Sequence, residues 1–249
     1  MILRKFIKHV SEQNWVAVGL DVIVVIVGIF LGMQVTNWNE GKKQESLEQE
    51  YIARLHRDLT TTIKNTEYNI RWDEARYQSE MIIKKSLDEG KLEEKDLQVF
   101  STGLFYLGFR NELALSWQTF EELKSTGLLS IIQDKTLLKD LGNLEDAYYR
   151  RKNILNSIED LNSTITSPLI DFYYVKSVAR NQATLVFDFE KISQNKKFKN
   201  IVSNITWRTH EMSEFRMYHY KQVKRVLASV EAIMEQQNIK ELPLNEGQS

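Results

Sequence analysis

The sequence predicts an all-α protein, with a single N-terminal transmembrane helix followed by an elongated antiparallel helical bundle. One segment, between Trp15 and Trp38, is apolar enough to leave water. After it, apolar residues recur every three or four positions over long stretches, which is the period of an amphipathic helix. The 249 residues include only two prolines and ten glycines, and no long run alternates between apolar and polar residues. Little of the chain is therefore left for a sheet.

The segment 15–38 has the length of a membrane span. As a helix it covers roughly 34 Å, against about 30 Å for the hydrocarbon core of a bilayer. Trp15 and Trp38 stand at its ends, where indole rings favour the level of the lipid headgroups, and they are the predicted membrane-boundary residues. The alternative is a buried core helix of a soluble protein.

Three residues of this segment share one line along the helix. At 100° per residue, Asp21, Gly28 and Gly32 fall within about 20° of one line along the helix. Two small residues four apart let helix backbones approach closely, and an acidic group inside a membrane is costly unless it is buried against protein. The pattern predicts an interface with a copy of the chain or with another membrane protein. In the alternative, Asp21 reaches the headgroups and the glycines are incidental.

The N-terminal flank sets the expected orientation. Residues 1–14 place apolar and basic side chains on opposite faces, as in a cationic amphipathic helix on a membrane surface. Three Lys or Arg residues precede the apolar segment and two follow it, which favours a cytoplasmic N-terminus and a body on the other side. The segment Met33–Trp38 offers no small-x-small cleavage site, so we expect an uncleaved signal anchor.

Residues 39–240 are expected to form the helical bundle. The first amphipathic pattern continues from the membrane exit to about Leu87, and Gly90 is its predicted end. Gly41 is either a hinge or a weak point in one continuous helix. A shorter helix begins near Glu93, and another spans Gln118 to Thr126, with Gly127 as its C-terminal stop.

The second half of the body is expected to hold two more long helices. Asp134 is positioned to cap one that runs to a kink or break at Pro168, after which the segment DFYYVKSVA continues in helical form. Residues 180–195 are expected to be a loop, in which Asp188 to Ile192 can form one turn, and a final helix runs from about Asn195 to Asn238. Residues 241–249 are predicted to form a disordered tail.

Composition excludes several classes of chemistry. Without cysteine, the chain has no disulfide, thiolate metal site or cysteine nucleophile. Residues 1–43 carry a net charge of +2 and the remainder −3, so the body lacks the basic character of a nucleic-acid-binding protein. His210 and Glu214 share a helical face, but neither Glu-x-x-His nor His-Glu-x-x-His occurs. We therefore expect an ordinary surface pair there, with no catalytic, cofactor-binding or metal-binding residue and no bound cofactor.

Aromatic residues gather in the second half of the chain. They allow two interpretations, a ligand pocket between helices or a core of large side chains, and we favour the core. The set comprises Trp117, Tyr148, Tyr149, Phe172, Tyr173, Tyr174, Trp207, Phe215, Tyr218 and Tyr220.

Two sequence blocks resemble a family of short bacterial membrane-anchored proteins of unknown function. In the first, an acidic residue opens an apolar run that ends in a Gln-x-x-Asn-Trp-Asn-Glu box, here Asp21 followed by residues 34–40. The second, SWQTFEELKSTGLLSIIQD at residues 116–134, looks like the family's segment T-x-x-x-L-K-S-S-G-x-L-x-x-I-x-D. The resemblance implies an integral membrane protein with a helical body, and it implies no activity or site residues. We expect the location to be the bacterial inner membrane.

These patterns favour a non-enzymatic membrane-anchored interaction or scaffold protein. Its expected partners are the lipid bilayer and either a second copy or a membrane protein bound through the transmembrane helix; no nucleic acid is expected. The alternative is a ligand-sensing helical bundle coupled to a membrane partner. A pocket of several hundred Å³ lined by the aromatic residues would favour this alternative, whereas a solid core would count against it.

Overall fold

The computed structural model describes residues 15–180 and 182–243. These residues are mostly α-helical, as the sequence predicts, with one small two-stranded sheet. The chain divides into two compact units, Met1–Glu50 and Tyr51–Ser249. The predicted surface helix at 1–14 lies outside the described residues, as does most of the predicted tail, from 244 to 249.

The first helix, α2 (Trp15–Glu89), is continuous through the predicted membrane exit. Gly41 lies within this helix and does not interrupt it. Of the two predicted alternatives, a hinge or a continuous helix, the structure therefore has the continuous helix. The helix ends where expected, because Gly90 adopts a left-handed conformation with φ +66° that residues with a Cβ rarely tolerate.

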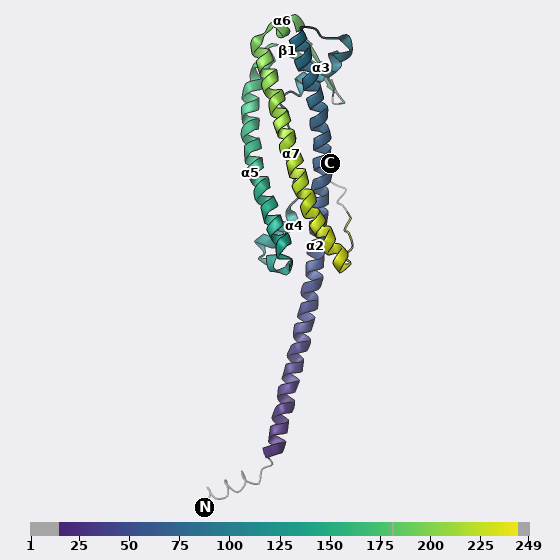
Figure 1. Ribbon diagram of the computed structural model, residues 1–249, viewed down its shortest axis with the longest axis vertical. Coiled ribbons are helices and arrows are strands. Elements are labelled where there is room, and N and C mark those ends of the chain that lie inside the picture. Colours follow the sequence, from purple (N-terminus) through teal and green to yellow (C-terminus); the bar gives the residue numbers. More distant parts are fainter. Residues whose placement is uncertain (1–14, 181, 244–249) are drawn as a thin grey trace, which may run out of the picture. The chain divides into compact units, whose positions relative to one another are not determined.

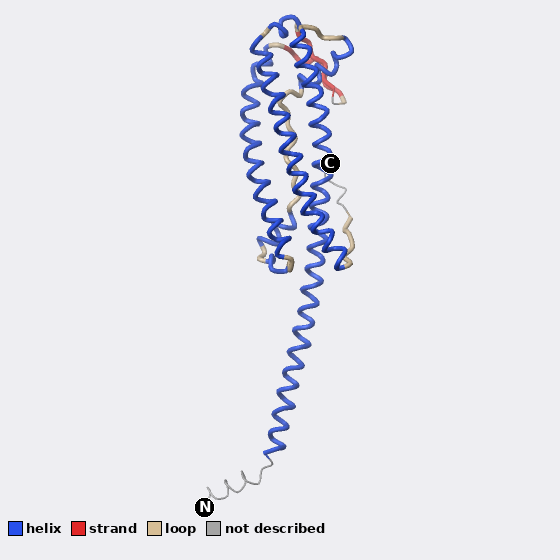
Figure 2. Tube along the Cα trace, viewed as in Figure 1, coloured by secondary structure: helices blue, strands red, loops and turns tan. Residues whose placement is uncertain are grey.

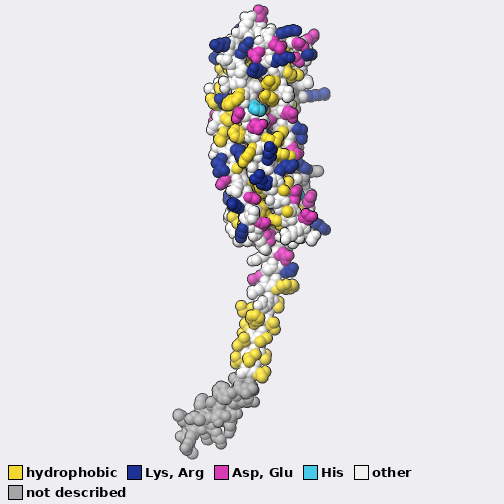
Figure 3. Space-filling model, in the orientation of Figure 1, with side chains coloured by type: hydrophobic (Ala, Val, Ile, Leu, Met, Phe, Trp, Pro, Cys, Tyr) yellow, Lys and Arg dark blue, Asp and Glu magenta, His cyan; other side chains and the backbone are white. Residues whose placement is uncertain are grey.

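In the first unit, the described side chains from Val22 to Val35 are exposed. Hydrophobic side chains cover the visible face of this segment in Figure 3. By length and composition, the helix that contains them is the one candidate membrane span among the described residues, and none of its apolar window is buried. This confirms the coarse prediction of a long apolar helix near the N-terminus.

In the second unit, two long helices accompany the later part of α2. These are α5 (Lys135–Thr166) and α7 (Lys196–Gln237), and Figure 1 shows them alongside it. Glu67 of α2 accepts a hydrogen bond from Tyr220 at 2.6 Å, and Glu80 accepts one from Thr209 at 2.9 Å. Since residue number rises along α2 while it falls along α7, the two helices run antiparallel.

Short elements connect these helices at positions set by local signals. They are η1 (Glu94–Asp96), α3 (Leu97–Phe105), α4 (Gln118–Ser125), η2 (Leu128–Ile131), η3 (Ser167–Asp171) and α6 (Phe189–Gln194). Gly127 ends α4 with φ +73°, as predicted. Asp134 caps α5 by accepting from the backbone N–H groups of Thr136 and Leu137 at 2.8 and 3.0 Å, also as predicted. At Pro168 the α-helix gives way to η3.

A β-hairpin replaces the helix predicted for DFYYVKSVA and the first part of the loop predicted for 180–195, whereas α6 lies where the sequence allows one turn around Asp188 to Ile192. Strand β1 (Tyr173–Ala179) pairs antiparallel with β2 (Gln182–Phe187), and α6 follows directly. The helix prediction is wrong because Tyr and Val favour extended backbone, and because the pairing buries Ala183 and Leu185 of β2. Arg180, between the strands, has φ +51°, a conformation typical of a tight hairpin connection.

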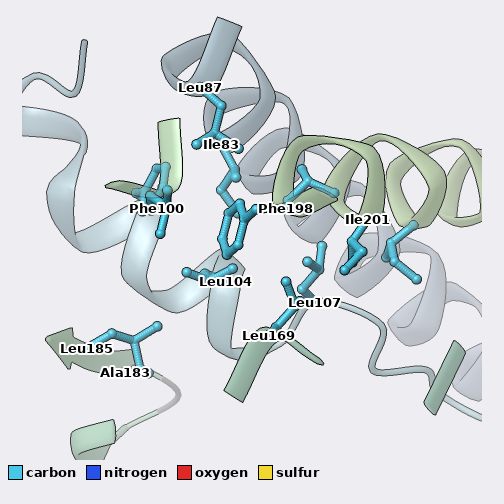
Figure 4. Close-up of a cluster of buried hydrophobic side chains, with 13 residues drawn as sticks. Ile83, Leu87, Phe100, Leu104, Leu107, Leu169, Ala183, Leu185, Phe198 and Ile201 are labelled. Atoms are coloured by element: carbon cyan, nitrogen blue, oxygen red, sulfur yellow. The ribbon is translucent and has the colours of Figure 1, made fainter. Parts of the chain in front are cut away.

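The hairpin is anchored on a buried hydrophobic cluster drawn in Figure 4. The cluster joins α2, α3, η3, β2, α6 and α7 at one end of the second unit. Its members are Ile83, Leu87, Phe100, Leu104, Leu107, Leu169, Ala183, Leu185, Ile192, Phe198, Ile201, Val202 and Ile205.

Candidate functional site

The segment between α3 and α4, residues 106–117, is held to the long helices by side chains that bond its backbone. Figure 2 shows it as loop running beside them. Arg216 of α7 donates from Nη1 to the carbonyl of Glu112 at 3.0 Å and from Nη2 to that of Asn111 at 2.9 Å. Arg76 of α2 donates to the carbonyl of Phe109. Backbone groups outside regular structure need such partners when they approach a core, so these arginines fix the path of the segment.

A buried cluster of charged residues supports these contacts. Arg216 Nε donates to Asp73 Oδ2 at 2.7 Å, and Arg76 lies 3.7 Å from Asp73 and 3.4 Å from Glu80. All four side chains are buried. Arg110 of the connecting segment adds a third guanidinium, so three cations meet two carboxylates. We name these five residues, Asp73, Arg76, Glu80, Arg110 and Arg216, the charged cluster.

Burial shapes the protonation of this cluster. Loss of solvent raises the pKa of Glu80, against the opposing effects of Arg76 and of the Thr209 hydrogen bond. Burial likewise lowers the pKa of Arg76. Burial, followed by repulsion from Arg76, lowers the pKa of Arg110 to about 10. Arg110 therefore still carries its charge at neutral pH, although burial has taken part of its solvent away.

Arg110 bridges two of the long helices. Its Nη1 donates to Thr209 Oγ1 of α7 at 3.1 Å. On α5, the buried Asn162 amide faces the guanidinium, and the amide orientation that satisfies both groups turns its oxygen toward Arg110, where it accepts from Nη2 at 3.0 Å and from Nε at 3.3 Å. These bonds use three of the five N–H groups of an arginine. The guanidinium is thus fixed in position, with two N–H groups outside these bonds.

Arg110 also lines a pocket of about 790 Å³. The pocket is bounded by the end of α3, the connecting segment, α5, η3 and β1. Its apolar lining consists of Phe105, Leu107, Phe109, Leu169, Ile170, Tyr173, Tyr174 and Val175. Its polar lining consists of Arg110, Glu159, Ser163, Thr166 and Ser167. A concave, mainly apolar space with a few polar groups is the usual form of a small-molecule site.

The residues predicted for the membrane helix belong to α2 and are not among the residues that line this pocket. Gly28 and Gly32 are exposed, and a Cβ built at either position meets nothing within 4 Å. Trp38 is also exposed. Trp15 and Asp21 belong to the helix, but their side chains fall outside what the structure describes. The predicted interface therefore remains a prediction.

The aromatic residues singled out in the sequence do not form one site. Tyr173 and Tyr174 line the pocket, whereas Trp117 and Tyr148 are buried in the core. Trp207 and Tyr218 are exposed. Part of the set thus lies in the core and part lines the pocket.

His210 and Glu214 are both exposed on α7. Among the described residues, no group of three or more His, Asp or Glu side chains is arranged to hold a metal ion.

The sequence patterns did not predict the charged cluster. One signal for it exists: Asp73, Arg76 and Glu80 occupy positions i, i+3 and i+7, on the same helical face as the buried Leu59, Thr62 and Thr66. Charged residues that keep the period of a buried face are candidates for pairing across a bundle. Arg110 has no such signal, because it lies in an irregular segment.

Comparison of the chain with protein-family models, with curated proteins and with solved structures finds no match.

Proposed function

We propose that the chain is a non-enzymatic, single-pass membrane protein in which the N-terminal helix anchors an elongated antiparallel helical bundle that serves as an interaction or scaffold module. The observation that carries this proposal is the exposure of the apolar segment. From Val22 to Val35 its large apolar side chains are 48–66% exposed. A bilayer would remove this surface from water, and the helix is long enough to cross one.

The proposed location is a bacterial inner membrane, with a cytoplasmic N-terminus and the body on the periplasmic side. The basic flank supports the orientation, and the family resemblance supports the membrane. Extraction of membranes with alkaline carbonate tests the anchor: the full chain should stay in the pellet. Recovery in the soluble fraction would contradict the proposal.

The anchor is also proposed to meet another helix through Asp21, Gly28 and Gly32. The open space above both glycines supports this, because a second backbone can approach closely there. Since the chain lacks cysteine, single cysteines can be introduced without background. Val25→Cys and Gly32→Cys should crosslink in membranes, either to a second copy or to a partner.

Phe30→Cys provides the matched control, because residue 30 lies on the opposite side of the helix from the glycines. Equal crosslinking at positions 30 and 32, or none at any position, would contradict the interface. Purification of wild type and Asp21→Asn in mild detergent then tests whether the carboxyl group contributes: loss of the partner in the variant is the expected result.

A second candidate function is ligand sensing by the bundle, and the pocket of about 790 Å³ specifically favours it. The pocket is bounded by α5, η3, β1 and the connecting segment, and the charged cluster on α2 and α7 bonds that segment. A bound ligand could therefore affect the packing of the long helices through the connecting segment. A screen of small molecules for thermal stabilisation of the full chain in lipid nanodiscs tests this function. A hit should lose its effect when Ile170 of the pocket wall is replaced by Asp.

A further inference from the structure

We propose that this pocket binds an organic carboxylate with an aromatic or aliphatic body, its carboxylate paired with Arg110 and its body lying against Phe109, Ile170 and Tyr174. The inference rests on the second candidate function above and adds the chemical class of the ligand.

The position of Arg110 is the first argument. Thr209 and Asn162 hold its guanidinium from α7 and α5, so little side-chain entropy remains to be lost when a ligand binds. A planar guanidinium fits a carboxylate through two parallel N–H···O bonds. The two N–H groups that Thr209 and Asn162 do not use are available for such a pair.

Charge complementarity is the second argument. In the charged cluster, three guanidiniums face two carboxylates, and burial raises the pKa of the Glu80 carboxyl. The cluster thus carries an excess of positive charge next to the pocket. Among the residues that line the pocket, Arg110 is the one that brings positive charge to its wall. An anion bound there would pair with a guanidinium that burial has partly removed from water.

The apolar wall is the third argument. Phe109, Ile170 and Tyr174 are 58%, 76% and 63% exposed. Large side chains this exposed around a concave surface favour an apolar occupant, and the volume suits a molecule of drug size. An inorganic anion would leave this wall uncovered, so the structure favours an amphipathic organic anion.

Glu159 places a limit on the ligand. It is the one acidic residue in the pocket lining, and it is exposed. Its charge disfavours ligands with several negative groups, which leaves monocarboxylates as the expected class. Glu159→Gln should therefore tighten binding of a monocarboxylate, by about two- to fivefold for a screened, exposed charge.

The test compares two compounds of nearly the same size and apolar body, 1-naphthaleneacetate and 1-naphthaleneacetamide, in which a neutral amide replaces the carboxylate. Both are titrated calorimetrically into the full chain in nanodiscs, with empty nanodiscs as the reference. We expect the carboxylate to bind at least tenfold more tightly than the amide. Arg110→Gln should abolish this preference and leave the amide nearly unaffected.

A second variant pair covers the case in which Arg110→Gln fails to fold. Ile170→Asp places a negative charge on the exposed pocket wall and should weaken carboxylate binding at least tenfold. Ile154→Asp, at an isoleucine of α5 that is 47% exposed and outside the pocket, is the matched control and should bind like wild type.

The outcomes separate the two levels of the proposal. Equal binding of the carboxylate and the amide, both sensitive to Ile170→Asp, would overturn the carboxylate assignment and leave a ligand pocket. Binding of neither compound, or binding insensitive to Ile170→Asp, would overturn the carboxylate assignment. Failure of the broad thermal screen would, separately, count against ligand sensing itself.

Discussion

Arg216 of α7 donates from Nε to Asp73 Oδ2 of α2 at 2.7 Å, with both side chains almost completely buried. Removing one partner of a buried pair leaves the other charge uncompensated, which is more costly than the net value of the pair. Asp73→Ala should therefore lower the free energy of unfolding by about 3–5 kcal/mol. Urea unfolding of the full chain in detergent, followed by tryptophan fluorescence, measures the change.

An exposed ion pair on the same helix supplies the control. Lys84 lies 2.9 Å from Asp88 in solvent, so Asp88→Ala should cost no more than about 0.5 kcal/mol. Because Arg216 also bonds the connecting segment, Arg216→Ala should additionally speed amide exchange in residues 111–116. Similar costs for Asp73→Ala and Asp88→Ala would show that the buried pair is not needed for stability.

Gly103 of α3 is packed against α2 more closely than any side chain allows. A Cβ at this position would lie 2.8 Å from Ser79 Cβ and 3.0 Å from Ile83 Cδ1. Gly103→Ala should therefore destabilise the fold by about 1–3 kcal/mol through overpacking, despite the better helix propensity of alanine.

Gly142 of α5 is the matched control, because a Cβ there meets nothing within 4 Å. Gly142→Ala should stabilise the protein by about 1 kcal/mol through helix propensity alone. Thermal melts of the two variants should shift in opposite directions. A shift in the same direction would place Gly103 outside the tight α2–α3 contact.

The helix ends were predictable because their signals are local. The glycines at positions 90 and 127 stop helices through their own backbone conformation, and Asp134 caps α5 through a bond to the adjacent turn. Tertiary contacts are not required for any of these. The start of α7 follows the same rule, since Asn195 accepts from the Phe198 N–H at 2.9 Å.

The hairpin and the charged cluster depend on partners distant in sequence. Strand β1 is exposed along most of its length, so Tyr173–Ala179 lacks the alternation that marks a strand. Asp73, Arg76 and Glu80 follow the period of the buried face, but their charge argues for solvent. Only the arginine at 216, more than a hundred residues later, reverses that conclusion. The pocket was not predictable, because η3, β1 and residues 106–110 meet only in the folded chain.

The hairpin is attached to α3 through one hydroxyl and one amide. Thr102 Oγ1 accepts from the Ala183 N–H at 3.2 Å, and Gln98 Nε2 donates to the Ala183 carbonyl at 3.0 Å. Thr102→Val keeps the shape of the side chain but leaves the Ala183 N–H without this acceptor. We expect a loss of about 1–2 kcal/mol, with faster amide exchange at Ala183.

Thr164→Val serves as the control for the Thr102 substitution. The Thr164 hydroxyl is exposed and bonds only the Asp160 carbonyl of its own helix, so its removal should leave hairpin exchange unchanged. Equal exchange at Ala183 in both variants would indicate that hydrophobic packing alone holds β2.

His219 of α7 should make stability depend on pH. Its Nε2 lies 3.0 Å from the Ala114 carbonyl and must donate to it, which leaves Nδ1 as the buried nitrogen without a hydrogen bond. Burial lowers the pKa of His219 to about 4, with smaller contributions from Arg151 and Arg216. In the unfolded chain, the histidine pKa is near 6.5. Between about pH 4 and pH 6.5, the unfolded chain therefore binds more protons at this histidine than the folded protein does. Stability should fall as pH drops through this window, by about 1.4 kcal/mol per unit and roughly 3 kcal/mol in all.

The variant His219→Gln isolates this dependence, because its amide can still donate to Ala114. Burial raises the pKa of Glu80, so that group acts in the opposite direction and stabilises the fold as pH falls. Glu80 is present in both proteins, and its effect cancels in the difference between their unfolding free energies. That difference should change by roughly 3 kcal/mol between pH 7 and pH 4. A constant difference across this range would mean that the folded protein accommodates a charged His219.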